Sequence, residues 1–158
     1  MRIQYLVCMM ILTPFTALAE GHNNALARME AGSIAMTNNL LDFYISRAPE
    51  LAASRPDMTW DDAYREAGQC VLDGLAAYSG EAGVAAYLAA LESFSTVEIA
   101  TFRDLTQKMP DVLAEPVALE LSSTCGMIAL GTARMEDSGL TAAFAEDGVM
   151  ERVLAPAE

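Results

Sequence analysis

The chain is poor in the residues that most enzymes use for proton and group transfer: its 158 residues include one histidine, His22, and one lysine, Lys108. Because His22 is close to the amino terminus and has no second histidine to support it, a histidine-activated serine or cysteine inside the fold is excluded. Lys108 precedes Met109 and Pro110 at an expected helix end, where it is better explained as a charge that stabilises the helix. No phosphate-binding glycine motif and no C-x-x-C-H haem motif occurs.

Long hydrophobic runs are missing too, and no stretch reaches the roughly 20 apolar residues of a membrane-spanning helix. The strongest run, residues 5–12, follows Arg2 and is followed by small residues at Ala17 and Ala19. This layout is typical of a secretory signal cleaved after Ala19, whereas a membrane anchor needs a longer run. We therefore expect cleavage of residues 1–19 and export to the periplasm or the medium.

Positive charge is scarce: nine lysine and arginine residues stand against 22 aspartate and glutamate residues, a net charge of −13. Removal of Arg2 with the signal leaves 8 basic and 22 acidic residues in residues 20–158, a net charge of −14. Nucleic-acid phosphates and anionic membrane surfaces repel such an anion, so we expect neither nucleic-acid binding nor membrane insertion. We expect residues 20–158 to form a single all-helical domain with frayed ends.

Cysteine is limited to three residues. Cys8 lies inside the signal, so a lipoprotein, which needs a cysteine just after the cleavage point, is not indicated. Cys70 and Cys125 remain, and an even pair in an oxidising compartment predicts one structural disulfide. Each cysteine lies on a stripe of small residues at helical spacing, which permits the Cα separation below about 7 Å that a disulfide needs. The stripes are Ala63, Ala67, Cys70, Gly74 and Ala77, and Ala118, Ser122, Cys125, Ala129 and Thr132.

The pattern of the remaining sequence is helical, because sustained period-two alternation is absent and alanine, leucine, glutamate and methionine dominate. We expect capping boxes at Thr59 and Asp62 and at Ser95 and Glu98, and a helix end at Gly80. Short loops favour antiparallel neighbours. The predicted fold class is all-α: a small antiparallel helical bundle of five to six helices stapled by one disulfide. Apolar spacings place the helices over residues 24–47, 59–78, 81–94, 95–109, 111–135 and 140–154.

Acidic side chains offer the main route to enzyme activity, as an acid-based hydrolase or a cation site. Ferritin-like di-iron sites need Glu-x-x-His pairs, which this chain cannot make, and no EF-hand loop is present. First-turn helix charges and solvated faces explain the acids better than catalysis does. The acids concerned are Asp57, Asp61, Asp62 and Glu66, and the pairs Glu136-Asp137 and Glu146-Asp147.

Four aromatic residues form a candidate apolar groove: Phe43 and Tyr44 near the end of the first expected helix, and Trp60 and Tyr64 at the start of the second. Ligand and peptide sites favour such residues. Packing in the core and at helix ends is the alternative explanation. The dispersed methionines are predicted to fill gaps in the core.

The expected mature terminus, Glu20-Gly21-His22, offers one metal site. Its amine, two deprotonated amides and the imidazole can supply four nitrogens in a plane, which suits Cu(II) or Ni(II). This site depends on cleavage after Ala19, and no other cofactor is indicated.

From these patterns we expect an exported, non-catalytic interaction or envelope accessory module that binds a protein or a small apolar ligand. The alternative is a Cu(II)- or Ni(II)-binding exported protein that uses the processed terminus, and an acid-based hydrolase ranks third. The sequence does not give the oligomeric state.

Overall fold

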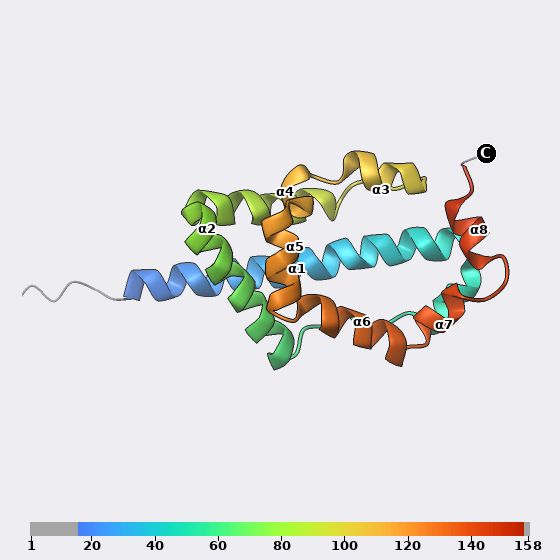
Figure 1. The fold of residues 1–158 in the computed structure, drawn as a ribbon, viewed down its shortest axis with the longest axis horizontal. Coiled ribbons are helices and arrows are strands. Elements are labelled where there is room, and N and C mark those ends of the chain that lie inside the picture. The colour runs from blue at the N-terminus through green and yellow to red at the C-terminus, as the bar shows by residue number, and fades with distance from the viewer. Residues whose placement is uncertain (1–15, 157–158) are drawn as a thin grey trace, which may run out of the picture.

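A computed structural model describes residues 16–156, with side chains from Asn24 onward, so residues 1–15 of the predicted signal lie outside the described part. Within residues 16–156 the protein is all-helical without a β-strand, which confirms the predicted all-α class. No helix in this range is long and apolar enough to cross a membrane. The helices, shown in Figure 1, are α1 (Thr16–Arg47), the 3-10 helix η1 (Pro49–Ser54), α2 (Asp62–Phe94), α3 (Phe102–Lys108), α4 (Asp111–Ala114), α5 (Pro116–Thr124), α6 (Met127–Asp137), α7 (Leu140–Phe144) and α8 (Val149–Leu154).

The described residues form eight α-helices and one 3-10 helix, more than the five to six helices expected. Proline and glycine divide the expected helix 111–135 into α4, α5 and α6. The residue before a proline disfavours the helical conformation, so Glu115 is extended (ψ 140°) and α5 begins at Pro116. Gly126 adopts a left-handed φ of 87°, which separates α5 from α6. The expected helix 140–154 is likewise divided, into α7 and α8.

The expected helices 59–78 and 81–94 are the two limbs of one bent element, α2. Gly80 lies at the bend with φ 68° and ψ −176°, a conformation that residues with a Cβ rarely adopt. The N-cap of α2 is Asp61 rather than the expected Thr59, because the Asp61 carboxylate accepts a hydrogen bond from the Tyr64 N–H (2.9 Å). The first limb crosses α1 obliquely in Figure 1, so a regular antiparallel bundle is not confirmed.

Apolar side chains gather in two core clusters that lie along α1. The first core cluster joins α1 to both limbs of α2 and to α5, whereas the second joins the end of α1 to η1, α3, α7 and α8. The first consists of Met29, Trp60, Tyr64, Val71, Leu72, Leu75, Val84, Tyr87, Leu88, Leu91 and Ala118, and the second of Leu41, Phe43, Ala48, Leu51, Phe94, Leu105, Leu140, Val149 and Val153.

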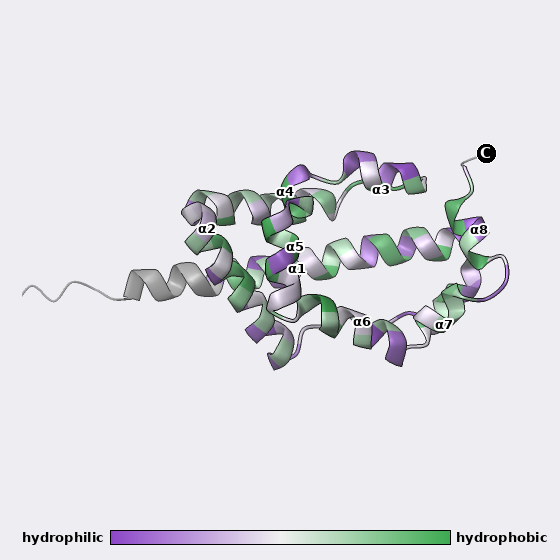
Figure 2. Ribbon diagram, viewed as in Figure 1, coloured by the Kyte–Doolittle hydropathy of each residue, from purple (hydrophilic) through white to green (hydrophobic). Residues whose placement is uncertain are grey.

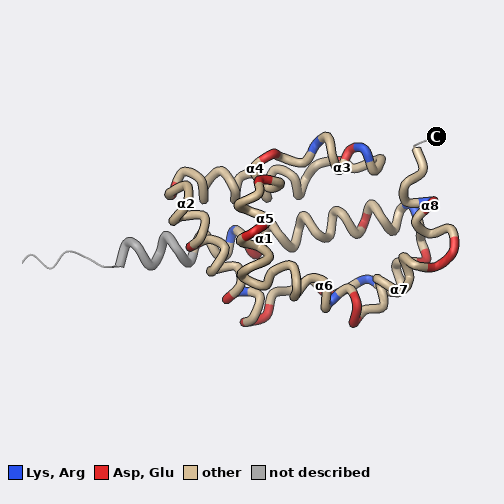
Figure 3. Tube along the Cα trace, viewed as in Figure 1, with Lys and Arg blue, Asp and Glu red and all other residues tan. Residues whose placement is uncertain are grey.

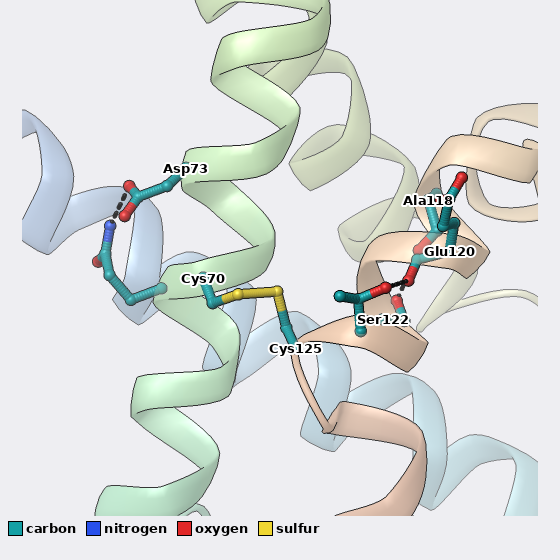
Figure 4. Close-up of a disulfide and its surroundings, with 8 residues drawn as sticks. Cys70, Asp73, Ala118, Glu120, Ser122 and Cys125 are labelled. Atoms are coloured by element: carbon teal, nitrogen blue, oxygen red, sulfur yellow. Dashed lines mark hydrogen bonds between the residues drawn. A yellow bond between two sulfur atoms is a disulfide. The ribbon is translucent and has the colours of Figure 1, made fainter.

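Cys70 and Cys125 form the predicted disulfide, with their Cα atoms 5.7 Å apart (Figure 4). In the stripe around Cys70, Gly74 faces Leu121 so closely that a Cβ at Gly74 would overlap that side chain. The predicted stripe around Cys125 is not continuous. Cys125 is the C-cap of α5, and Gly126 begins a new helix. The disulfide therefore joins a residue within α2, Cys70, to the end of α5, and not to the middle of a helix face.

The carboxyl end of the chain returns to the end of α1. Arg47 donates hydrogen bonds to the carbonyl oxygens of Ala155 (2.7 Å) and Pro156 (3.2 Å). These two residues of the expected frayed tail are therefore held in place, and residues 157–158 lie outside the described part.

Candidate functional site

Three of the acids singled out from the sequence, Asp57, Asp61 and Asp137, line a polar pocket of about 500 Å³ together with Arg134. The Arg134 guanidinium donates to the Asp61 carboxylate (3.0 Å) and to the backbone carbonyls of Asp57 (3.1 Å) and Thr59. It also stacks on the Tyr64 ring, 4.2 Å from the ring centroid. Arg134 therefore ties α6 to the segment that precedes α2.

No sequence motif predicts this role of Arg134. The sequence offers one clue to it: Arg134 is the only basic residue between Lys108 and Arg152. In a chain with so few cations, an isolated arginine in a helix has many acids within reach, and the sequence does not say which of them it meets.

Asp57 and Asp61 both have a pKa below the usual value for aspartate. The main cause for Asp57 is the hydrogen bond from the Thr59 N–H (2.9 Å), and for Asp61 the hydrogen bond from the Tyr64 N–H; the charge of Arg134 adds to both. Both carboxylates are thus held ionised at neutral pH. A general acid needs the opposite, a raised pKa, so this pair gives the hydrolase hypothesis no support.

The other acids do not converge on this pocket as a group. Asp62 is fully exposed in the first turn of α2 and lies 3.6 Å from Arg65, and Glu66 is also exposed. The pairs Glu136-Asp137 and Glu146-Asp147 are exposed on α6 and between α7 and α8. Among the described side chains, no group of three or more histidine, cysteine, aspartate or glutamate residues could hold a metal ion.

The predicted metal terminus belongs to the backbone of α1, but the side chains of Glu20, Gly21 and His22 lie outside the described part. Inside a helix their amides donate to carbonyls four residues earlier, and cleavage after Ala19 would remove those acceptors. Binding of Cu(II) or Ni(II) there stays a prediction.

The four predicted groove aromatics do not line one groove. Trp60 and Tyr64 stack as expected, with ring centroids 5.6 Å apart, but both are buried in the first core cluster. Phe43 is buried in the second cluster, 3 % exposed. Tyr44 alone reaches an open apolar groove, where its ring packs edge-on against Phe144 with centroids 5.3 Å apart.

This apolar groove has a volume of about 570 Å³ and lies between the second half of α1 and the last helices of the chain. Its walls come from α1, α3, α6, α7 and α8, and the ribbons of α7 and α8 include hydrophobic stretches in Figure 2. No charged side chain lines it. Its most exposed apolar residues are Phe102 (40 %), Met135 (38 %), Met150 (51 %) and Leu154 (50 %). We call it the docking groove.

Five acidic residues lie close in sequence to residues that line the docking groove, and one of them, Asp137, lines the polar pocket. Glu136 and Asp137 follow Met135, Glu146 and Asp147 form the loop between α7 and α8, and Glu151 follows Met150. Figure 3 shows these acids at the end of α6 and in the loop after α7. All five are exposed, and none forms an ion pair with another residue of the described chain. The two arginines of this region are already paired, Arg134 with Asp61 and Arg152 with Glu50.

No sequence pattern predicts the docking groove, because residues of α1 and α6 meet there with residues of three short helices that were expected as parts of longer ones. Phe102, Phe144 and Met150 follow no common spacing, and only the fold brings them together.

The class that fold and site define is a small all-α, disulfide-linked protein with an apolar groove beside an acidic rim. Comparisons with protein-family models, with curated proteins and with solved structures gave no match to this chain. The residues and geometry of this chain are therefore the basis for inferring its function.

Proposed function

We propose that this protein is an exported, non-catalytic interaction module that binds a basic amphipathic helix of a partner protein in the docking groove. The observation that carries the proposal is the groove itself: about 570 Å³ without a charged lining residue, with five exposed acids close in sequence to its lining residues that form no ion pair within the described chain. The signal-like start and the Cys70–Cys125 disulfide are compatible with export.

An amphipathic helix fits this groove better than an unspecific apolar ligand does, because of the charges at the rim. Helix-in-groove recognition uses an apolar helix face that fills the groove while polar residues of the helix remain at the edge. An edge with five acids favours lysine and arginine at those positions and disfavours glutamate. Met135 and Met150 at the groove edge can adjust to different apolar side chains, since methionine is unbranched and polarizable.

The proposal is tested with a synthetic amphipathic helix of leucine and lysine, and with a matched peptide in which glutamate replaces lysine. Fluorescence anisotropy should show binding of the lysine peptide alone. Affinity should fall as ionic strength rises from about 0.01 M to about 0.15 M, because the Debye length shortens from about 30 Å to about 8 Å. Equal binding of the glutamate peptide would contradict the proposed electrostatic selection.

Two exposed leucines provide a matched pair of variants. Leu154 of the docking groove is 50 % exposed and Leu119 on α5 is 52 % exposed, so neither substitution by glutamine should disturb the fold much. Leu154→Gln should weaken binding of the lysine peptide about tenfold, since it removes one apolar contact worth on the order of 1.4 kcal/mol. Leu119→Gln should leave binding unchanged. The same loss in both variants would place the peptide elsewhere.

A further inference from the structure

A second pocket, of about 230 Å³, lies behind Trp60 and Tyr64 and is separate from the docking groove. It is bordered by α1, both limbs of α2, α5 and α6, and no charged side chain lines it. The two cavities have only Thr37 and Met135 in common among their lining residues. We call this second cavity the Tyr64 pocket.

The hydroxyl of Tyr64 is the unusual feature of this pocket. Tyr64 is buried, with 3 % of its surface exposed, and its hydroxyl oxygen has no hydrogen-bond partner. Buried polar groups are nearly always hydrogen-bonded, because burial without a partner removes their hydrogen bonds to water and replaces them with nothing. Within the described chain only Arg47 Nε shares this condition. A group that fits the pocket and accepts this hydrogen bond would supply the missing partner.

The surroundings of the hydroxyl indicate the shape of such a group. Gly131 leaves space beside it, since a Cβ there would lie 3.5 Å from the Tyr64 hydroxyl oxygen. Ser122, also in the pocket wall, already donates its hydroxyl proton to the Ala118 carbonyl at 2.8 Å (Figure 4). The Arg134 guanidinium covers the Tyr64 ring from the side of the polar pocket, where Asp61 binds it. Ser33 and Thr37 also contribute uncharged hydroxyls to the wall, but among the hydroxyls of the pocket only that of Tyr64 is both fully buried and without a partner.

We infer that the Tyr64 pocket binds a small neutral aromatic molecule with a single oxygen acceptor, which receives the Tyr64 hydroxyl hydrogen bond. The size fits, because a protein cavity of about 150 Å³ holds benzene and this one is larger by the volume of a small substituent. The absence of charge from the lining disfavours an ionised ligand. This site does not rest on the proposed peptide binding, and either can fail alone.

The test uses acetophenone and ethylbenzene, two probes of similar shape of which only the first carries an acceptor. The chain has one tryptophan, Trp60, which lines the pocket, so its single indole N–H resonance reports binding in a titration. Both probes should shift it. Tyr64→Phe removes only the unpaired hydroxyl and should leave the fold intact. It should weaken acetophenone binding about fivefold, the value of one ordinary hydrogen bond, and leave ethylbenzene binding unchanged.

Two further variants separate this outcome from an indirect effect. Tyr44→Phe removes a tyrosine hydroxyl from the docking groove and should change the binding of neither probe. Gly131→Leu fills the space beside the Tyr64 hydroxyl and should abolish both shifts. The inference is overturned if neither probe moves the Trp60 resonance, or if Tyr64→Phe affects the two probes equally.

Discussion

The two core clusters are held together by different means. The first core cluster is built on α2, the longest described helix, and the disulfide fixes α2 to the end of α5. The second cluster has no covalent link. It joins the ends of α1 and α2 to η1 and to the short helices α3, α7 and α8, each of seven residues or fewer. Isolated helices of this length have marginal stability in water, so these three are stabilised mainly because their apolar faces pack against the rest of the protein.

This difference places the proposed peptide site at the less constrained end of the molecule. The docking groove is formed by the short helices of the second cluster, whereas the Tyr64 pocket lies within the stapled first cluster. Binding surfaces that must adapt are commonly drawn from regions of low local stability. We expect an adaptable groove and a preformed pocket in the same chain, and the following variants test that contrast.

The largest effect is expected from the centre of the second cluster. Phe94 is 0 % exposed, and Phe94→Ala should lower the free energy of unfolding by about 3–5 kcal/mol because it leaves a cavity. Urea unfolding measures the loss. Tyr78→Ala, on the same helix but 71 % exposed, is the control and should be close to neutral. Comparable losses in both variants would show that Phe94 is not a core residue.

Removal of the disulfide comes next. The double variant Cys70→Ser, Cys125→Ser should lose up to about 4 kcal/mol, since the unfolded chain regains the freedom of a loop with a separation of 55 residues. Hydrogen exchange should show the loss of protection mainly in α5 and α6, with α7 and α8 less affected. A uniform loss would mean that the two clusters unfold as one unit. Reducing agent should destabilise the wild type and not the variant.

A smaller effect is expected at the start of α3. Thr101 is its N-cap and forms a capping box with Asp104, in which each side chain accepts from the backbone N–H of the other residue. Thr101→Ala should cost about 1 kcal/mol in urea unfolding. Thr106→Ala removes an exposed hydroxyl later in the same helix and should cost less. An equal cost would show that the cap adds nothing specific.

The same capping box gives the smallest effect, which depends on pH. The Lys108 ammonium and the Thr101 N–H lower the pKa of Asp104 from 3.8 to about 2. Because the folded pKa is depressed, the stabilisation is complete above about pH 4 and disappears as the pH falls toward 2. Asp104→Asn should therefore be less stable than wild type at neutral pH, and the two melting curves should converge in acid. Lys108→Gln should show part of the same loss, and a constant gap at all pH values would contradict this origin.

Sequence patterns anticipated the regular parts of this fold and missed the interruptions. Met29 and Phe43, which lie in the expected helix 24–47, are both buried, and the Cys70–Cys125 pairing is confirmed. The fourth expected helix began at Ser95 in the prediction, but α3 begins after Thr101, because two Thr/Ser-x-x-acid patterns compete and only one is used.

The sites were harder to anticipate than the helices. The sequence predicts Trp60 and Tyr64 as a pair, but it does not predict that Gly68 lies against the Trp60 ring or that Gly131, far along the chain, lies beside the Tyr64 hydroxyl. Tyr44 was recognised without its partner Phe144, which comes from a helix only five residues long. The spacing of apolar residues within one helix predicts which face of that helix is apolar. It does not predict which faces of separate helices pack against each other.

The position of the disulfide has a mechanical consequence. Cys125 is linked covalently to α2, and α6 starts immediately beyond it at Gly126, so this end of α6 is fixed. Met135 lies about 14 Å along α6 from Gly126, and the neighbouring Arg134 holds that end of α6 to Asp61. Since Met135 lies in the walls of both the docking groove and the Tyr64 pocket, the two attachments of α6 set the width of both openings at once.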